Sequence, residues 1–436
     1  MSEGAVHKFY SLGFCESATA QFEQPDRFRF FDQLPAEPVI AQGAGLSLVG
    51  AGFRNGGHVI GMRAFNRILS FDDNAGTIEV EAGVTLGRLF KFLAPKKWSV
   101  AVQPGFPSIT IGGCIAGNVH GKNQYSEGCF GSRVETINLV HPRHGYLTLS
   151  ESSNPELFDL TIGGYGLTGV ILSARLRLAP LTATSARIQS IPVSGLAEAC
   201  QVMTDQQNDA DFIYSWHDMS TPTRGQGLVF FGTMLSEAGI SIDQQHWSEL
   251  RQEKFAPPFG LMNRWSIAAM NKIYRNIQTR TRVLSLWNAL FPFVSNAAYF
   301  YLYGRRGFIE HQVLIPNLAI HEYLQQFKSL AIRHSISSSL VTLKLFKGTP
   351  RLLHFSGNGV SLAVEVPAGE SACAFFADLD RLDCDLGCRT NAIKDARLPV
   401  SVLNQQYPEA EEFRQRLRDF DPVRQFRSVL SERLGL

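Results

Sequence analysis

The order of apolar and polar residues predicts short strands and one helix in the first part of the chain. A short apolar strand at 38–42 leads into a glycine-rich loop. Apolar and polar residues alternate at 67–71 and again at 77–83, on either side of an Asp-Asp-Asn-Ala-Gly turn, which predicts a β-hairpin. Within 85–98 the apolar residues recur at helical spacing, so this stretch is expected to form an amphipathic helix.

The pattern changes after Leu181, where a new alternating strand begins and helices alternate with strands to about residue 380. Helical spacing then dominates the last stretch of the chain. We therefore predict an α+β protein in three parts: a first domain at 1–181, a second domain at 182–389 and a C-terminal segment at 390–436.

Composition narrows the class of protein. The chain has 436 residues, and 41 Lys and Arg against 39 Asp and Glu give a formal net charge of +2, which argues against a general nucleic-acid binder. Its 7 scattered cysteines predict reduced thiols in a cytoplasmic protein. Cys384 and Cys388 lack the two further ligands that zinc would need, so no metal is predicted. The N-terminus lacks the basic and apolar regions of a Sec-type signal peptide.

One uncharged, aromatic segment at 283–304 raises the question of a membrane. Its length suits a spanning helix, but Asn288, Pro292, Ser295 and Asn296 are costly in hydrocarbon. A basic stretch at 264–282 precedes it, which favours a surface that contacts lipid or a lipid-tailed substrate. An ordinary buried core is the remaining alternative.

Three glycine-rich blocks carry the candidate chemistry, at 43–47, 103–123 and 163–172. Glycines let backbone N–H groups approach a ligand closely, and such loops suit a phosphorylated or flat molecule. The first block lacks the GxGxxG pattern of nicotinamide-binding domains. His120 and Lys122 lie in the second block without hydrophobic periodicity, so a role toward a ligand is favoured over a core position.

The ordered set of motifs resembles the vanillyl-alcohol-oxidase / p-cresol methylhydroxylase flavoprotein superfamily. Within it, the chain is most similar to the branch that oxidises polyprenyl-phosphate-linked ribose. The resemblance spans nearly the whole chain. It rests on the three glycine blocks and on VHGKN at 119–123, SEGCFG at 126–131, PELF at 155–158, YSWHD at 214–218, QVLIP at 312–316, LKLF at 343–346, KDAR at 394–397 and DPVR at 421–424.

The resemblance implies a first domain that binds FAD, a second domain with an antiparallel sheet and helices that holds substrate, and a C-terminal segment that packs back on the first. The cofactor is expected to be bound without a covalent link, since Leu46 stands at the linking position; attachment at His58, in Arg-Asn-Gly-Gly-His, is the alternative. The residues implied around FAD are Ala41, Gly43, Gly45, Ser47, Gly105, Thr110, Ile111, Gly112, Gly113, Gly117, Asn118, His120 and Ile171.

The resemblance also implies the chemistry. The enzyme would oxidise a secondary hydroxyl to a ketone, with hydride moving to the flavin and a base taking the hydroxyl proton. Lys394, His120 and Lys122 are the expected catalytic residues. Trp216, Gln312, Lys344 and Phe346 are the expected substrate-binding residues.

Several positions depart from the family pattern. Leu48 stands where an aromatic residue covers the flavin, and Asn391 replaces a tyrosine near it. Ala363 replaces an active-site cysteine, Ser361 its neighbouring asparagine, and Glu310 a glutamine. Substrate details are therefore expected to differ.

The expected substrate is a polyprenyl-phosphate-linked ribose oxidised at C2, the first half of an epimerisation to arabinose for cell-envelope glycans. A short-chain reductase is the expected partner for the second half, and the protein would contact the inner membrane peripherally. A soluble sugar, alditol or aldonolactone oxidase of the same superfamily is the alternative. A binding protein without FAD is a further one.

Overall fold

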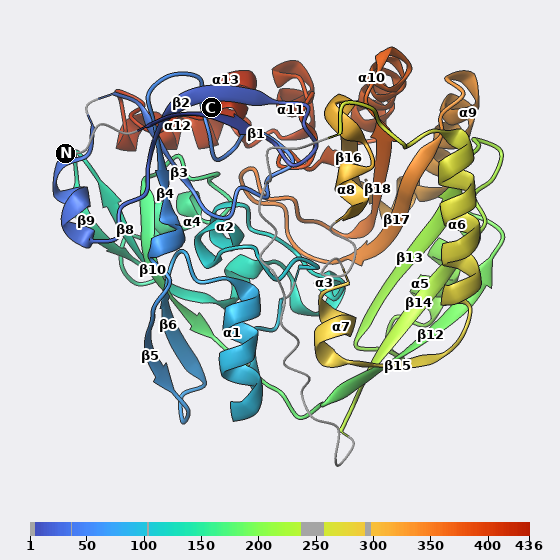
Figure 1. Cartoon of the computed structure of the whole chain (residues 1–436), viewed down its shortest axis with the longest axis horizontal. Coiled ribbons are helices and arrows are strands. Elements are labelled where there is room, and N and C mark those ends of the chain that lie inside the picture. Colours follow the sequence, from blue (N-terminus) through green and yellow to red (C-terminus); the bar gives the residue numbers. More distant parts are fainter. Residues whose placement is uncertain (1–4, 36, 103, 237–256, 293–297) are drawn as a thin grey trace.

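The computed structural model describes residues 5–35, 37–102, 104–236, 257–292 and 298–436. Gln103 of the second glycine block, and Phe293, Ser295 and Asn296 of the aromatic segment, lie outside them. Figure 1 shows two sheet-based units side by side, with the last helices of the chain above the first unit.

The first unit begins with a four-stranded sheet in the order β1-β2-β4-β3. β3 runs parallel to β4, so the chain must cross from the end of β3 to the start of β4. This connection contains the first glycine block. β3 is the strand predicted at 38–42. The bounds are β1 Ala5–Tyr10, β2 Ser17–Glu23, β3 Val39–Gln42 and β4 His58–Gly61.

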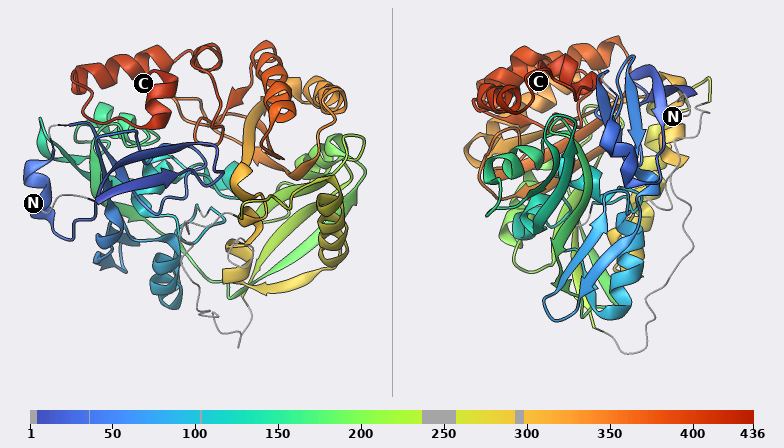
Figure 2. Two further views of the ribbon diagram at one scale, coloured as in Figure 1. Left: turned by 45° about the horizontal axis from the view of Figure 1, so that its top comes forward. Right: turned by 90° about the vertical axis from the view of Figure 1, so that its left-hand side faces the viewer.

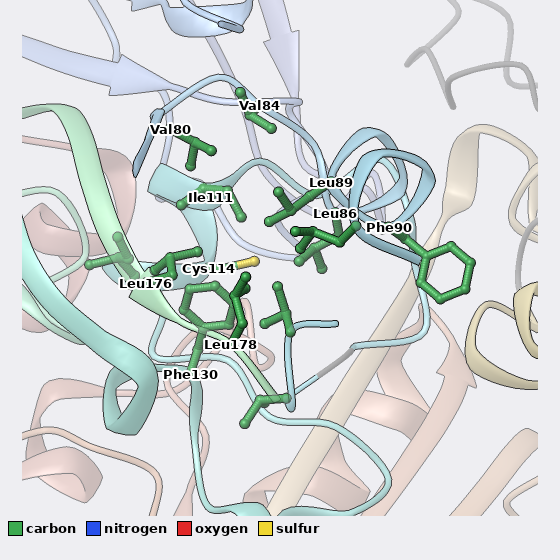
Figure 3. Close-up of a cluster of buried hydrophobic side chains, with 14 of the residues drawn as sticks. Val80, Val84, Leu86, Leu89, Phe90, Ile111, Cys114, Phe130, Leu176 and Leu178 are labelled. Atoms are coloured by element: carbon green, nitrogen blue, oxygen red, sulfur yellow. The ribbon is translucent and has the colours of Figure 1, made fainter. Parts of the chain in front are cut away.

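A five-stranded antiparallel sheet follows, in the order β5-β6-β10-β8-β9. The predicted hairpin is confirmed as β5 and β6. The apolar face of this sheet packs on α1 (Leu86–Leu93) and α2 (Ile111–Ala116), and Figure 3 shows buried side chains of these elements meeting in one cluster. The bounds are β5 Ile68–Asp72, β6 Thr77–Glu81, β8 Val134–His141, β9 Gly145–Leu149, β10 Val170–Arg177, α3 Gln124–Glu127 and α4 Pro155–Thr161.

The predicted helix at 85–98 exists but is shorter. α1 (Leu86–Leu93) begins after Thr85, whose hydroxyl accepts the Arg88 N–H, and a 3-10 turn with Pro95 follows it. Lys97 is left-handed, with φ 63°, which turns the chain into β7 (Trp98–Ser99). β7 pairs with β11 (Ala179–Pro180), so the helix ends where this pairing starts.

α2 (Ile111–Ala116) is anchored to the first glycine loop. The Thr110 hydroxyl caps the helix by accepting the Gly113 N–H. A Cβ atom at Gly43 would collide with that same hydroxyl. The loop after β3 and the start of α2 therefore meet at a contact that only glycine permits.

The second unit is an eight-stranded antiparallel sheet, in the order β15-β12-β14-β13-β17-β18-β16-β19. Helices α5, α9 and α10 cover one face in a large apolar cluster. The other face is turned toward the first unit. The bounds are β12 Ser185–Val193, β13 Phe212–Met219, β14 Gly227–Leu235, β15 Arg282–Ser285, β16 Phe308–Pro316, β17 Ser338–Phe346, β18 Gly359–Pro367, β19 Arg389–Thr390, α5 Leu196–Asp205, α6 Arg264–Gln278, α7 Leu286–Leu290, α8 Ala298–Tyr301, α9 Ile320–Arg333 and α10 Glu370–Asp385.

The C-terminal helices lie beside the N-terminal strands, as Figure 2 shows. Val39 in β3 donates its N–H to the Gln425 carbonyl and accepts the Arg427 N–H. Apolar residues from both ends of the chain share one buried cluster. The helices are α11 Val400–Gln406, α12 Ala410–Phe420 and α13 Val429–Leu434.

The aromatic segment at 283–304 lies mostly inside the protein. Trp287 and Phe291 are buried in the core of the first unit, and Phe300 and Tyr303 in a smaller cluster. These four side chains therefore pack on protein, and the contact of the segment with lipid or a lipid-tailed substrate stays a prediction. Within the described residues, the structure has no helix long and apolar enough to cross a bilayer.

Candidate active site

A cavity of about 610 Å³ lies between the two units, a size typical of ligand sites. The glycine-rich segments of the first unit form one wall and the inner face of the eight-stranded sheet forms the other. Most of the expected site residues line it. These are Ala41, Gly43, Gly45, Ser47, Gly105, Thr110, Gly112, Gly113, Gly117, His120, Lys122, Ile171, Trp216, Gln312, Lys344 and Lys394.

One end of the cavity fits a pyrophosphate. No hydrogen bond within the described part of the chain occupies the backbone N–H groups of Ala44, Gly45 and Leu46. The turn around them, 42–52, has no charged side chain. Unpaired N–H groups in such a turn are donors for anionic oxygens, so this turn would hold the FAD pyrophosphate.

The middle of the cavity fits a flat ring. The α2 backbone packs so closely that a Cβ at Gly112 would lie 3.0 Å from that of Ala82, and one at Gly117 3.1 Å from Ile393 Cδ1. Glycines therefore keep this wall thin and expose its backbone to a ligand. Gly105 and Ile171 line the same region, which would hold the isoalloxazine.

Three expected residues do not line the cavity. Ile111 is buried in the core behind α2. The Asn118 side chain accepts the Gly131 N–H instead of facing a ligand. Phe346 is buried against Phe355 and contacts the His120 ring edge-on at 4.9 Å between centroids, so it supports His120.

His120 is held by a chain of amides. Asn391 Nδ2 donates to Gln312 Oε1 at 2.8 Å, which fixes the orientation of the Gln312 amide. Gln312 Nε2 then lies 3.1 Å from Ser361 Oγ and 3.2 Å from His120 Nε2. His120 Nε2 must therefore act as the acceptor, with the ring proton on Nδ1. Burial, together with Lys344 and Lys394, holds the pKa of His120 well below its ordinary value, so the ring is neutral at pH 7.

Two lysines on opposite walls titrate near neutrality. Lys122 donates to the Ala289 carbonyl at 2.8 Å and lies 4.9 Å from the centre of the Tyr214 ring. Burial and the nearby Lys344 ammonium lower the pKa of Lys122 to about 7. Burial and Lys394 lower the pKa of Lys344 to about 8, although Glu310 opposes this.

Lys394 is paired with a carboxylate. Its Nζ lies 3.2 Å from Glu310 Oε1. Glu310 on β16 stands directly opposite Glu365 on β18, and Tyr299 donates to Glu365 Oε2 at 2.9 Å. Burial and the Glu310 charge raise the pKa of Glu365 to about 8, so it is mostly protonated at pH 7. Within the described residues, Glu310 is thus the carboxylate that pairs with a cavity lysine.

A second charged cluster lies on the other face of the sheet. His311 Nδ1 lies 2.8 Å from Asp395, its Nε2 lies 3.0 Å from Asp383, and Arg397 binds both Asp380 and Asp395. Burial lowers the pKa of His311, but the two carboxylates outweigh this and raise it to about 10. Three of these groups lie close enough to share a metal ion, yet Arg397 and His311 already neutralise their charge.

His58 lies outside the cavity lining. Its two ring nitrogens lie 3.1 Å from Glu23 and 2.6 Å from Glu37. Both nitrogens are therefore within hydrogen-bonding distance of carboxylates, an arrangement that favours the expected non-covalent cofactor over attachment here.

The structure adds residues that sequence reasoning did not assign to the site. Glu365 forms a carboxylate pair with Glu310 and accepts a hydrogen bond from Tyr299. The Tyr214 ring faces Lys122, and Asn391 donates a hydrogen bond to Gln312. The sequence feature that could have identified Glu365 is its spacing of two and four residues from Ala363 and Ser361, which places all three on one face of a strand.

Comparison with known proteins agrees with this geometry. Residues 35–150 match the family described as FAD binding domain. The chain is 31% identical over 421 residues to decaprenylphosphoryl-beta-D-ribose oxidase of Mycolicibacterium smegmatis, covering 91% of this chain and 89% of that protein. It is 26% identical to probable L-gulonolactone oxidase 6 of Arabidopsis thaliana over 46% of this chain and 36% of that one.

Human Delta(24)-sterol reductase is 22% identical over 71% of this chain and 64% of its own length. The near-complete match to the mycobacterial oxidase, together with the FAD-binding match, rules against the alternative of a flavin-free binding protein. The chain therefore belongs to the FAD-linked oxidase family of the vanillyl-alcohol-oxidase / p-cresol methylhydroxylase superfamily, and it is an FAD-dependent oxidoreductase.

Proposed function

We propose that this enzyme oxidises the C2 hydroxyl of a polyprenyl-phosphate-linked ribose to a ketone. The observation that carries the proposal is the surplus of basic groups that line the cavity: among the described residues, Lys394 pairs with the Glu310 carboxylate, whereas Lys122 and Lys344 have no such partner. Such a surplus favours an anionic substrate over a neutral sugar. The mycobacterial relative, whose name specifies decaprenylphosphoryl ribose, supports the same choice.

The chain's own residues divide the work. FAD, when bound, supplies the acceptor for the two electrons that leave the substrate carbon. Lys344 Nζ has no hydrogen-bond partner among the described residues and would bind the phosphate, while Lys394, held by Glu310, would orient the sugar. Lys122 is the group best matched to accept the hydroxyl proton, because its pKa is about 7 and a base works best near the operating pH.

The apolar part of the cavity suits a lipid tail. Met270 and Tyr274 of α6, Phe300 and Pro292 all line the cavity, and the Tyr274 ring packs against Trp216. Aromatic and thioether side chains bind prenyl groups through burial of apolar surface. This supports a substrate with a phosphate joined to a hydrocarbon chain.

The ketone product implies a second enzyme. Reduction of the new carbonyl from the opposite face would give the arabinose form, so a short-chain reductase is the proposed partner. The proposed place is the cytoplasmic side of the inner membrane, where a lipid-linked sugar for envelope glycans would be made.

Anaerobic flavin reduction tests the proposal. The FAD-loaded protein is mixed with a short-prenyl phosphoryl-β-D-ribose, and in parallel with free ribose, alditols and aldonolactones. We expect loss of the flavin's visible absorbance only with the phosphorylated lipid sugar. Bleaching by a free alditol or lactone, and none by the lipid sugar, would establish the soluble-oxidase alternative instead.

The proton acceptor is tested separately. Lys122→Met should retain FAD and lower kcat by about 10²-fold or more, and the rise of kcat with pH near 7 should disappear. Lys394→Met should mainly raise KM. If the Lys122 variant keeps the wild-type pH dependence of kcat, another group accepts the hydroxyl proton.

A further inference from the structure

Exposed large apolar side chains are concentrated in one stretch of the sequence of the second unit, which includes helix α6. Among the described residues, 13 large apolar side chains are exposed, and six of these fall between 259 and 283. They are Phe259, Leu261, Trp265, Ile273, Ile277 and Val283. A concentration of this kind marks an interaction surface, because single exposed apolar residues are usually scattered.

Helix α6 has two different apolar faces. Its inner face carries Ile267, which is fully buried, and Met270 and Tyr274, which line the cavity. Its outer face carries Trp265, Ile273 and Ile277, with exposed fractions of 72%, 61% and 54%. Figure 1 shows α6 along the margin of the second unit, in front of β13 and β14. The same helix thus separates the cavity from an exposed apolar stripe.

The charges around this stripe have one sign. Residues 255–309 contain seven Lys and Arg and no Asp or Glu, although the whole chain is almost neutral. Three of the basic residues, Arg264, Lys272 and Arg280, are exposed on or beside α6. The Arg264 guanidinium lies 4.6 Å from the centre of the Trp265 ring. Tryptophan and arginine together suit the boundary between lipid headgroups and acyl chains.

We propose that the α6 outer face, defined as Phe259, Leu261, Trp265, Ile273, Ile277 and Val283 with Arg264, Lys272 and Arg280, docks on an anionic lipid bilayer. The apolar stripe would enter the headgroup boundary and the cations would contact acidic lipids. The inference extends the proposed function, because a lipid-tailed substrate would then meet the protein beside the cavity wall. It does not depend on which sugar is oxidised.

A second copy of the chain is a less suitable occupant. Two-fold association would bring the α6 outer face against itself, and Arg264, Lys272 and Arg280 would meet the same residues of the other copy without any acidic residue from 255–309. Like charges placed opposite each other oppose such an interface. An acidic bilayer supplies the missing negative charge.

Vesicle flotation tests the proposal with the FAD-loaded full chain. Wild type is mixed with phosphatidylcholine vesicles that contain or lack phosphatidylglycerol. We expect flotation with the acidic vesicles, reduced at high salt. The triple variant Trp265→Ser, Ile273→Asn, Ile277→Asn should lose about tenfold or more of this binding. The matched control is Leu318→Asn, a fully exposed leucine elsewhere, which should float like wild type.

Anaerobic flavin reduction by a short-prenyl substrate in solution separates docking from catalysis. The triple variant should bleach at the wild-type rate, because none of its three residues lines the cavity. If wild type does not float, or the triple variant floats equally well, the proposal is wrong whatever the substrate proves to be. If wild type forms a dimer that the triple variant does not form, and neither protein binds lipid, a second copy of the chain is the occupant of this face instead of a bilayer.

Discussion

Neighbouring residues of β16 belong to two charged clusters with different properties. His311 points to the helix-covered face, where Asp383 and Asp395 balance its charge and Arg397 also pairs with Asp395. Glu310 and Gln312 point to the cavity, where Lys344 and Lys122 have no carboxylate partner within the described part of the chain. Lys394 and Asp395 repeat the division, since each contributes to a different cluster.

The difference shows how one strand serves structure and function together. A buried charge is costly unless it is paired, so the helix-face cluster fixes the segment after β19 to the sheet. The cavity cluster is left underpaired, with lysine pKa values lowered toward neutrality. Perturbed groups that lack partners and face a cavity are candidates for ligand binding.

The largest expected effect follows from breaking the helix-face cluster. Asp395→Ala leaves His311 and Arg397 with less compensation in a buried site, so the free energy of unfolding should fall by about 3–5 kcal/mol. Urea denaturation of the FAD-loaded protein measures this. A loss below about 1 kcal/mol would show that the cluster does not hold this part of the fold.

Removing a charge from the cavity should not have this effect. Lys344→Met deletes an ammonium without a carboxylate partner and keeps the stem of the side chain, so the free energy of unfolding should stay within about 0.5 kcal/mol of wild type or rise. The exposed Lys328→Met is the control in the same urea experiment. A large loss of stability would mean that Lys344 is structural.

The two clusters should also respond to pH in opposite directions. The pKa of His311 is raised from 6.5 to about 10, so its stabilisation is complete below pH 6.5 and is lost as pH rises to 10. The pKa of Lys344 is lowered from 10.5 to about 8, so its destabilisation is present below pH 8 and is relieved between 8 and 10.5.

Differences between wild type and variants isolate these contributions. The deficit of His311→Gln relative to wild type should shrink as pH rises from 6.5 to 10. Any advantage of Lys344→Met should disappear between pH 8 and 10.5. Thermal or urea unfolding across this range measures both, and parallel curves for all three proteins would contradict the assignment.

A stability effect smaller than that of Asp395→Ala is expected at Asn391. Asn391→Ala removes the hydrogen bond that orients Gln312, which should cost about 1 kcal/mol of stability. Because Gln312 then loses its fixed amide orientation, kcat should fall by about tenfold while FAD absorbance remains. The conservative Asn391→Asp, which still offers an acceptor but no donor to Gln312 when ionised, should not restore the rate. Full activity of Asn391→Ala would remove this positioning role.

Local patterns predicted local structure well. β3, the β5–β6 hairpin and the start of α1 follow from alternation, turn residues and a capping threonine. The end of α1 did not, because Pro95 and the left-handed Lys97 divert the chain toward a distant strand. The aromatic segment at 283–304 was ambiguous, since apolar composition alone does not say whether lipid or protein covers it.

The site was predicted in part. The order of the motifs predicted that Lys122, Lys344 and Lys394 share one site, and in the structure all three line the cavity. Side-chain direction was less accessible: Ile111, Asn118 and Phe346 lie within a residue or two of cavity-lining positions and point elsewhere. The pairing of Glu310 with Glu365 depends on strand register across 55 residues of sequence, which no local pattern specifies.

Selectivity for phosphate tests the central claim most directly. kcat/KM is measured for a short-prenyl phosphoryl-ribose and for the matching phosphate-free prenyl riboside, in wild type and in Lys344→Met. The Lys344 ammonium should make wild type prefer the phosphate substrate, and the variant should lose about tenfold or more of that preference. An equal preference in both proteins would contradict the claim that Lys344 recognises the phosphate of the substrate.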